Sequence, residues 1–272
     1  MAALLLVGGG KMGGALLAGW LAKGDVAARD VCVVEPDAGA AARLREQHRV
    51  TVIGAADSLE ASFAPAVTVF AVKPQVMGDV APAYRDLVAP GRVFLSIAAG
   101  KTIANFEDYL GTDAAIVRAM PNTPAAVGRG ITVLCANPHV TADQRAACTN
   151  LLAAVGETAW TEDEGDMDAV TAVSGSGPAY VFLLIECLAE AGVAAGLGAD
   201  LAARLARATV AGAGELARLS DDPAATLRQN VTSPGGTTAA ALDVLMAGDG
   251  LQPLMTRAVA AATARGRELA GG

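Results

Sequence analysis

Three glycines near the start of the chain have the spacing of a phosphate-binding turn. The pattern Gly8-x-Gly10-x-x-Gly13 follows the apolar run Leu4–Val7 and precedes a stretch with helical spacing. Gly8 permits a tight turn, Gly10 lets a pyrophosphate approach the backbone, and Gly13 lets the helix lie close to the strand. The N–H groups at the start of such a helix attract phosphates. The pattern predicts a dinucleotide site, with a plain glycine-rich turn as the alternative.

An acid stands where the adenosine ribose of a dinucleotide would lie. Glu35 is at the C-terminal end of the predicted strand 31–36, roughly 20 residues after the glycine turn. A carboxylate there accepts a hydrogen bond from a ribose 2′-hydroxyl and repels a 2′-phosphate. The next basic residue is Arg43, so the local chemistry favours NAD over NADP. The alternative is a solvated acid at a strand end.

A second helix start in the C-terminal half has the chemistry of an anion cradle. In Ser233-Pro234-Gly235-Gly236-Thr237-Thr238, Ser233 fits the N-cap and Pro234 the first helical position. The two glycines then leave the first N–H groups free of side chains. Together with the hydroxyls of the segment, they predict binding of a carboxylate or phosphate, and simple capping is the alternative.

A strong general acid is missing from the predicted ligand edge. The two histidines, His48 and His139, lie away from it, and no Tyr-x-x-x-Lys pair exists. Lys73 is the one lysine at the end of a predicted strand, where it either contacts the cofactor or remains a surface lysine. Such a site suits a protonated cyclic imine, because its C=N⁺ bond accepts a hydride directly.

The elements that must position these residues divide the chain in two. Strands and helices alternate over residues 1–160, which predicts an α/β fold with a Rossmann-type, doubly wound parallel sheet. The orientation of the later strands stays open. The predicted strands cover residues 4–7, 31–36, 50–53, 67–72, 93–98, 115–118, 131–135 and 157–160, and short helices are expected at 57–63 and 77–87.

Residues 161–272 read as an all-α domain. A capping box is expected at Thr161 and Glu164, and helices are expected over residues 166–194, 200–219, 223–230, 234–247 and 251–269. The segment 174–180 places Gly and Pro inside a helix, which indicates close approach of a ligand or a backbone, or else a kink. The apolar face of residues 201–217 predicts a twofold dimer interface, with an internal core helix as the alternative.

Composition limits the function classes. The 272 residues are 53% hydrophobic and 18% charged, with a net charge of −8, which supports a real core and disfavours nucleic acid or an anionic membrane as a partner. The four scattered cysteines fit a reducing compartment and no metal site. No signal-peptide pattern and no apolar run of about 18 residues is visible, so we expect a cytoplasmic protein outside the membrane.

Taken together, these stretches resemble pyrroline-5-carboxylate reductase, the last enzyme of proline biosynthesis. The resemblance follows the order of the chain and rests on residues 8–15, 71–74, 96–100, 120–124, 168–171, 174–180 and 233–238. It implies NADPH or NADH as cofactor, 1-pyrroline-5-carboxylate as substrate and L-proline as product. It also implies an N-terminal Rossmann domain and a C-terminal dimerisation domain, in dimers that often assemble into decamers.

The resemblance also assigns roles to residues. Thr238 would lie near the ring nitrogen as a proton donor. Substrate contacts would come from Ser233, Gly235, Gly236, Thr237, Thr238 and Ser176. Cofactor contacts would come from Gly8, Gly10, Lys11, Met12, Gly13, Glu35, Ser58, Ala71, Val72, Lys73, Pro74, Ala98, Gly100 and Asn122.

One residue departs from the family pattern, and two other functions compete with this interpretation. Many family members prefer NADPH, whereas Glu35 is acidic, although Lys11 could partly offset it. A related imine or 2-hydroxyacid reductase is one rival, but a hydroxyacid enzyme should carry a lysine in its helical half, and none follows Lys101. A nucleotide-sensing regulator with the same fold is the other, and a degenerate 233–238 segment would favour it.

Overall fold

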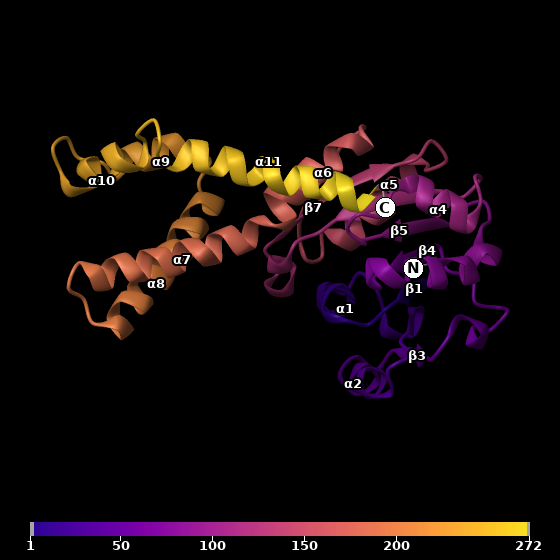
Figure 1. Cartoon of the computed structure of the whole chain (residues 1–272). Helices are drawn as coiled ribbons and strands as arrows, with labels where there is room; N and C mark the ends of the chain where they lie inside the picture. Colours follow the sequence, from indigo (N-terminus) through magenta and orange to yellow (C-terminus); the bar gives the residue numbers. More distant parts are fainter. Residues whose placement is uncertain (1–2, 271–272) are drawn as a thin grey trace. The chain divides into compact units, whose positions relative to one another are not determined.

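The chain forms two compact units. The computed structural model describes residues 3–270. One unit contains the described parts of Met1–Gly175 and Ala262–Gly272, and the other is Ser176–Ala261. The predicted boundary between residues 160 and 161 lies earlier than this division, because residues 161–175 pack with the sheet. Figure 1 shows the sheet unit in indigo to magenta and the helical unit mainly in orange.

The first unit is built on an eight-stranded sheet of order β3-β2-β1-β4-β5-β6-β7-β8. All eight predicted strands are confirmed. Six are parallel, β7 runs antiparallel to β6, and β8 runs parallel to β7. The order reverses between β1 and β4, which is the switch point where ligands bind in such sheets. The strands are β1 Leu4–Val7, β2 Val31–Val34, β3 Thr51–Ile53, β4 Val67–Phe70, β5 Val93–Ser96, β6 Ile116–Met120, β7 Gly130–Ala136 and β8 Gly156–Trp160.

Both faces of this sheet are buried. Alternate residues of β1 belong to two different cores, with Leu4 and Leu6 on one side and Leu5 and Val7 on the other. All four side chains are at most 3% exposed, which explains why the strand is apolar without alternation. The covering helices are α1 Lys11–Lys23, α2 Ala38–His48, α3 Met77–Val80, α4 Ile103–Leu110 and α5 Ala142–Leu152, with short 3-10 turns between them.

Two local predictions in this unit are wrong. Residues 57–63 form no helix beyond the 3-10 turn Ala56–Ser58. The capping box at Thr161 does not form, because the carboxylate of Glu164 accepts from the backbone N–H of Ile103 and from Arg118, both at 2.8 Å. Asp163 serves as the N-cap instead, accepting from the N–H of Gly165. Partners distant in sequence thus bind the Glu164 side chain that the capping box would have used.

The chain enters the helical unit through a π-helix. α6, Met167–Val170, leads into the π-helix Thr171–Gly175, and the predicted long helix resumes as α7 only at Gly177. The remaining helices are α7 Gly177–Ala194, α8 Ala199–Leu219, α9 Ala224–Asn230, α10 Thr237–Leu245 and α11 Leu251–Ala270. α7 and α8 pack closely, since a Cβ on Gly192 would lie 3.2 Å from that of Ala202.

Apolar side chains of this unit remain uncovered within one chain. On α7, Phe182 is 60% and Leu184 50% exposed, and on α8, Leu201 is 51% exposed. α8 is therefore not an internal core helix of this chain, so that alternative is wrong, and the twofold dimer interface stays a prediction. Residues 164–194 are also long and apolar enough to cross a membrane by length and composition alone. The expected absence of such a stretch therefore fails, because the structure joins segments that the sequence separates by Gly and Pro.

Candidate functional site

A hollow of about 550 Å³ lies at the carboxyl edge of the sheet. Four parallel strands, β1, β4, β5 and β6, end at it, and the residues that follow them form its walls. These are residues 10–12, 71–74, 97–99 and 120–123, joined by Gly175. The hollow therefore spans the switch point between β1 and β4, the expected place for a ligand in a doubly wound sheet.

The glycine turn has the conformation that a dinucleotide requires. Gly8 has φ +99°, and a Cβ there would lie 2.9 Å from the backbone of Ala71. A Cβ on Gly13 would lie 2.1 Å from the carbonyl oxygen of Gly8, so helix α1 contacts the strand backbone directly. A Cβ on Gly10 would meet no atom within 4 Å, because its α-carbon faces open space. The close packing predicted at Gly8 and Gly13 is confirmed, and the open space at Gly10 fits the approach of a pyrophosphate, which stays a prediction.

The first turn of α1 is open to an anion. Gly10 is its N-cap and offers no side-chain cap, so the first backbone N–H groups of the helix have no acceptor from that residue. Lys11 and Lys73 both line the hollow with exposed side chains. Helix N–H groups with two nearby ammonium groups are a suitable site for a pyrophosphate, even in a chain of net charge −8.

Glu35 is fixed beside the glycine turn. One carboxylate oxygen accepts from the N–H of Gly9 at 2.9 Å, and the other accepts from the N–H of Asp37 at 3.0 Å. A carboxylate oxygen can accept more than one hydrogen bond, so each keeps capacity for a ribose hydroxyl. The backbone N–H groups of the turn thus hold a negative charge at the end of β2.

The predicted cofactor residues fall into three groups. Nine line the hollow: Gly10, Lys11, Met12, Ala71, Val72, Lys73, Pro74, Ala98 and Asn122. Gly8, Gly13 and Glu35 shape the turn beside it. Gly100 has φ +73° and lies against Leu269 of α11, and Ser58 is exposed at the end of its 3-10 turn, with its hydroxyl donating to Asp57. The structure thus does not bring Ser58 or Gly100 to the walls of the hollow.

Other residues of the hollow were missed. Ile97, Ala99, Met120, Pro121, Thr123 and Gly175 line it but were not predicted as site residues. Most follow the ends of β5 and β6, so strand order alone could have identified them. Gly175 comes from the π-helix and gives no such signal. A Cβ on it would lie 2.5 Å from the methyl carbon of Met120, which explains the glycine.

The second anion cradle begins later than predicted. α10 starts at Thr237 with Gly236 as its N-cap, so Ser233 is not the cap and Pro234 is not the first helical residue. Gly235 has φ +69°, a left-handed conformation outside any helix, and the carbonyl of Ser233 accepts from the N–H of Gly236. The N-terminus of α10 remains free of a side-chain cap, and Thr238 lies half-buried in its first turn.

Ser176 and the α10 segment are separate within the helical unit. Ser176 directly precedes α7, whereas α10 lies at the other end of the unit, as Figure 1 shows. A single chain therefore does not gather all the predicted substrate residues in one place.

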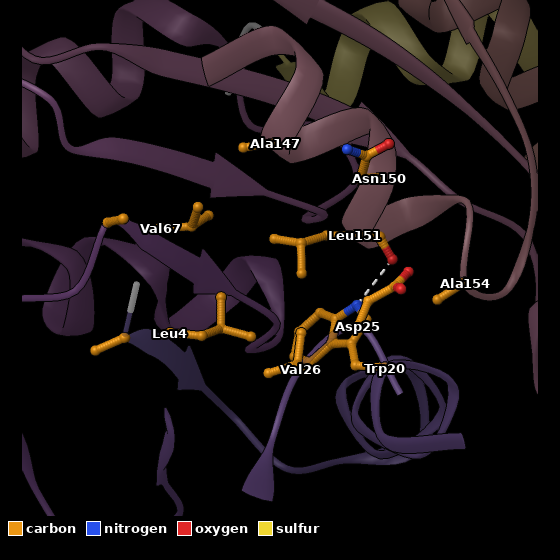
Figure 2. A pocket seen from close by; sticks show the side chains of 11 residues that line it. Leu4, Trp20, Asp25, Val26, Val67, Ala147, Asn150, Leu151 and Ala154 are labelled. Atoms are coloured by element: carbon orange, nitrogen blue, oxygen red, sulfur yellow. Dashed lines mark hydrogen bonds between the residues drawn. The ribbon is translucent and has the colours of Figure 1, made fainter. Parts of the chain in front are cut away.

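A second hollow, of about 510 Å³, lies at the amino edge of the sheet. Figure 2 shows Leu4, Val67 and Leu151 around it, with Trp20 donating from its indole N–H to the Leu151 carbonyl at 2.8 Å. Its lining is largely apolar and it lies away from the glycine turn. It does not have the donors that a dinucleotide needs. Among residues 3–270, no group of His, Cys, Asp and Glu side chains could hold a metal ion.

Two family models match different parts of the chain. Residues 164–269 match the family model described as pyrroline-5-carboxylate reductase dimerisation, and residues 3–100 match the one described as NADP oxidoreductase coenzyme F420-dependent. Among curated relatives, the pyrroline-5-carboxylate reductase of Pseudomonas aeruginosa is 40% identical over 98% of this chain and 96% of its own. That of Mycobacterium tuberculosis is 42% identical over 99% and 97%.

Solved structures agree. A pyrroline-5-carboxylate reductase from Coxiella burnetii superposes with a TM-score of 0.93 at 35% identity, covering 98% of each chain. The Plasmodium falciparum pyrroline carboxylate reductase with NADP bound has a TM-score of 0.81 at 30% identity, covering 99% of this chain and 98% of its own. The glycine turn, the hollow beside it and these full-length similarities lead to one conclusion: this chain belongs to the pyrroline-5-carboxylate reductase family.

Proposed function

We propose that this chain reduces 1-pyrroline-5-carboxylate to L-proline, using NADPH or NADH. The observation that carries the proposal is the hollow at the switch point, with the glycine turn and two lysines on its wall. The enzyme is an oxidoreductase that acts on a cyclic imine, which needs no strong general acid because its C=N⁺ bond is already activated.

The residues of the hollow fit a dinucleotide. The turn of Gly8, Gly10 and Gly13, with the first N–H groups of α1, would hold the pyrophosphate. Ala71, Lys73 and Ala98 would border the nicotinamide end. When bound, the cofactor supplies the hydride that reduces the imine carbon. The walls contribute positioning, which accounts for the largest share of the acceleration in a reaction of this kind.

The substrate carboxylate would bind at the start of α10. The N–H groups of Thr237 and Thr238 begin the helix, where its dipole favours an anion, whereas the N–H of Gly236 is already donated to the Ser233 carbonyl. The glycines keep that approach free of side chains. Thr238, one residue further into the helix, would donate its hydroxyl proton towards the ring nitrogen, or steady it there.

We propose that α10 reaches the cofactor from the partner subunit of a dimer. Ser176 is bonded to Gly175, which lines the hollow, whereas α10 lies at the far end of the helical unit from the start of α7. The exposed side chains of α7 and α8 supply an apolar interface for that partner. Only 6% of the most apolar window in 164–194 is buried within one chain, and a partner subunit would cover it. Such dimers would in turn assemble into a decamer, a state that the mass of the protein in solution would reveal.

Two finer properties belong to the proposal. Glu35, held by the N–H groups of Gly9 and Asp37, favours NADH over NADPH. The enzyme acts in the cytoplasm, where its free cysteines, three of them buried, stay reduced.

The test is an initial-rate assay with purified protein. Oxidation of NADH and of NADPH is followed with and without 1-pyrroline-5-carboxylate, and L-proline is measured as product. A rate that does not rise with the imine would remove the proposed function. Parallel assays with 2-keto acids and other cyclic imines distinguish a related reductase, and binding of the dinucleotide without any turnover would indicate a regulator.

A further inference from the structure

Asn122 is a buried residue whose amide bonds two distant segments. It follows β6 and is 9% exposed. Its Oδ1 accepts from the N–H of Ile131 at 3.0 Å, and its Nδ2 donates to the carbonyl of Ser174 at 3.2 Å. The first bond fixes the start of β7, and the second reaches the π-helix. Both the oxygen and the nitrogen of the amide are therefore hydrogen-bonded to backbone groups, although the residue lines the cofactor hollow.

The carbonyl of Ser174 needs a donor from outside its helix. The N–H of Ala179, the partner that a π-helix would offer to the Ser174 carbonyl, is donated to the Ser176 carbonyl instead. In the α-helical pattern of α7, the carbonyl of residue 174 would accept from the N–H of residue 178. That residue is Pro178, which has no N–H to give. Ser174 is half-buried, and a backbone carbonyl shielded from water without a partner is costly. Asn122 supplies the donor that Pro178 lacks.

The same bond determines where Gly175 lies. Gly175 follows Ser174, lines the hollow and contacts Met120, because a Cβ there would lie 2.5 Å from the Met120 methyl carbon. The hydroxyls of Thr171 and Ser174 bond back to the carbonyls of Met167 and Val170, at 2.7 and 2.9 Å. These bonds are local, whereas the bond from Asn122 joins the π-helix to the residues that follow β6.

We propose that Asn122 is a positioning residue of the reductase reaction. It replaces the helical N–H donor that Pro178 cannot provide. It thereby positions Gly175, which lines the hollow where the cofactor would bind. The proposal rests on the proposed function, since its main readout is turnover. It differs from a direct contact of the Asn122 amide with the cofactor, because the effect passes through Ser174.

An aspartate variant makes this role visible as a pH profile. In Asn122→Asp, one carboxyl oxygen can still accept from the N–H of Ile131. The other can donate to the Ser174 carbonyl only when it is protonated, and when ionised it repels that oxygen. Burial raises the pKa of such a carboxyl. The charged side chains lining the same hollow are Lys11 and Lys73. Wild type shares their own titration, so the ratio of variant to wild-type turnover cancels it, whereas their positive charge opposes the effect of burial on the pKa of the new carboxyl.

We expect that ratio to fall about tenfold or more between pH 5.5 and pH 8.5, since small misplacements of a reacting group cost up to about 100-fold. The dinucleotide dissociation constant, measured by fluorescence quenching, should stay close to the wild-type value. Asn150→Asp is the matched control, because Asn150 is exposed at the amino edge of the sheet. Its turnover ratio should not vary with pH.

A rescue experiment covers the case in which the aspartate variant does not fold. Pro178→Ala returns an N–H to position 178, so the pair Asn122→Ala and Pro178→Ala should regain much of the turnover and thermal stability lost in Asn122→Ala alone. A flat pH ratio in a folded aspartate variant, or no rescue in the double variant, would overturn the proposal. So would a rise in the dinucleotide dissociation constant equal to the loss of activity. Inactive wild-type protein would instead remove the proposed function.

Discussion

The choice between NADH and NADPH should depend on the charge of Glu35. Its carboxylate is held by the N–H groups of Gly9 and Asp37 at 2.9 and 3.0 Å, so it does not turn away when a larger ribose approaches. The side chain is half-buried, and water screens it. Two unit charges about 5 Å apart in water repel by about 0.8 kcal/mol. A 2′-phosphate carries nearly two charges, which gives about 1.5 kcal/mol.

That repulsion corresponds to about a tenfold difference in rate. Replacing Glu35 by Ser should therefore raise the ratio of kcat/KM for NADPH to kcat/KM for NADH about tenfold. Glu35→Gln should do nearly the same, because it removes the charge and keeps the shape. Glutamine keeps one accepting oxygen and therefore one of the two loop bonds, whereas serine is too short to accept from both N–H groups. Agreement between the two variants therefore assigns the effect to charge rather than to loop support.

The assay is a set of initial rates with each cofactor at a fixed concentration of 1-pyrroline-5-carboxylate. Glu46→Gln, an equal change of charge at an exposed position of α2, is the control and should leave the ratio unchanged. An unchanged ratio in both Glu35 variants would mean that Glu35 does not meet the ribose. A ratio that moves equally in the control would assign the effect to net charge.

Three further predictions concern the substrate helix, the interface and a buried thiol. Thr238→Ala should lower kcat about 100-fold with the cofactor KM unchanged, and full turnover would remove its proton-donor role. Phe182→Glu should reduce the mass measured by light scattering and abolish turnover, since Phe182 is 60% exposed on α7; an unchanged mass would place the interface elsewhere. Burial raises the pKa of Cys148 to about 12. Because the unfolded thiol ionises first, Cys148 should lower the free energy of unfolding by about 1.4 kcal/mol per pH unit above about pH 8.5. Cys148→Ala should lose that part of the slope and keep the part that comes from buried Cys32 and Cys135, whose pKa values are also raised.

Much of the fold could be predicted because its causes are local. The run Leu4–Val7 is apolar at every position, which indicates burial on both faces, and the glycines after it specify the turn to α1. Burial at every position is also seen in β2, β4 and β5. The ligand edge follows from the strand order, since parallel strands end together at the residues that line the hollow.

Helix starts were less predictable, because one sequence supports two registers. The segment at Ser233 offers a cap and a proline at suitable spacing, yet Gly235 adopts φ +69° and α10 begins at Thr237. Thr161 and Glu164 have capping-box spacing, but Glu164 bonds Arg118 and the N–H of Ile103 instead. Glu164 bonds the buried cation Arg118 rather than the backbone N–H of Thr161, because the ion pair is the stronger interaction.

The sequence by itself determined the dinucleotide turn, the acid beside it and the two-part order of the chain, because each depends on residues within one or two turns of one another. Only the tertiary structure decided which donor pairs with the Ser174 carbonyl, for which Pro178 has no N–H. The missing N–H can be read from the proline, but the donor that replaces it is Asn122, 52 residues away from the Ser174 carbonyl. Distant partners of this kind are selected by packing, which no local pattern specifies.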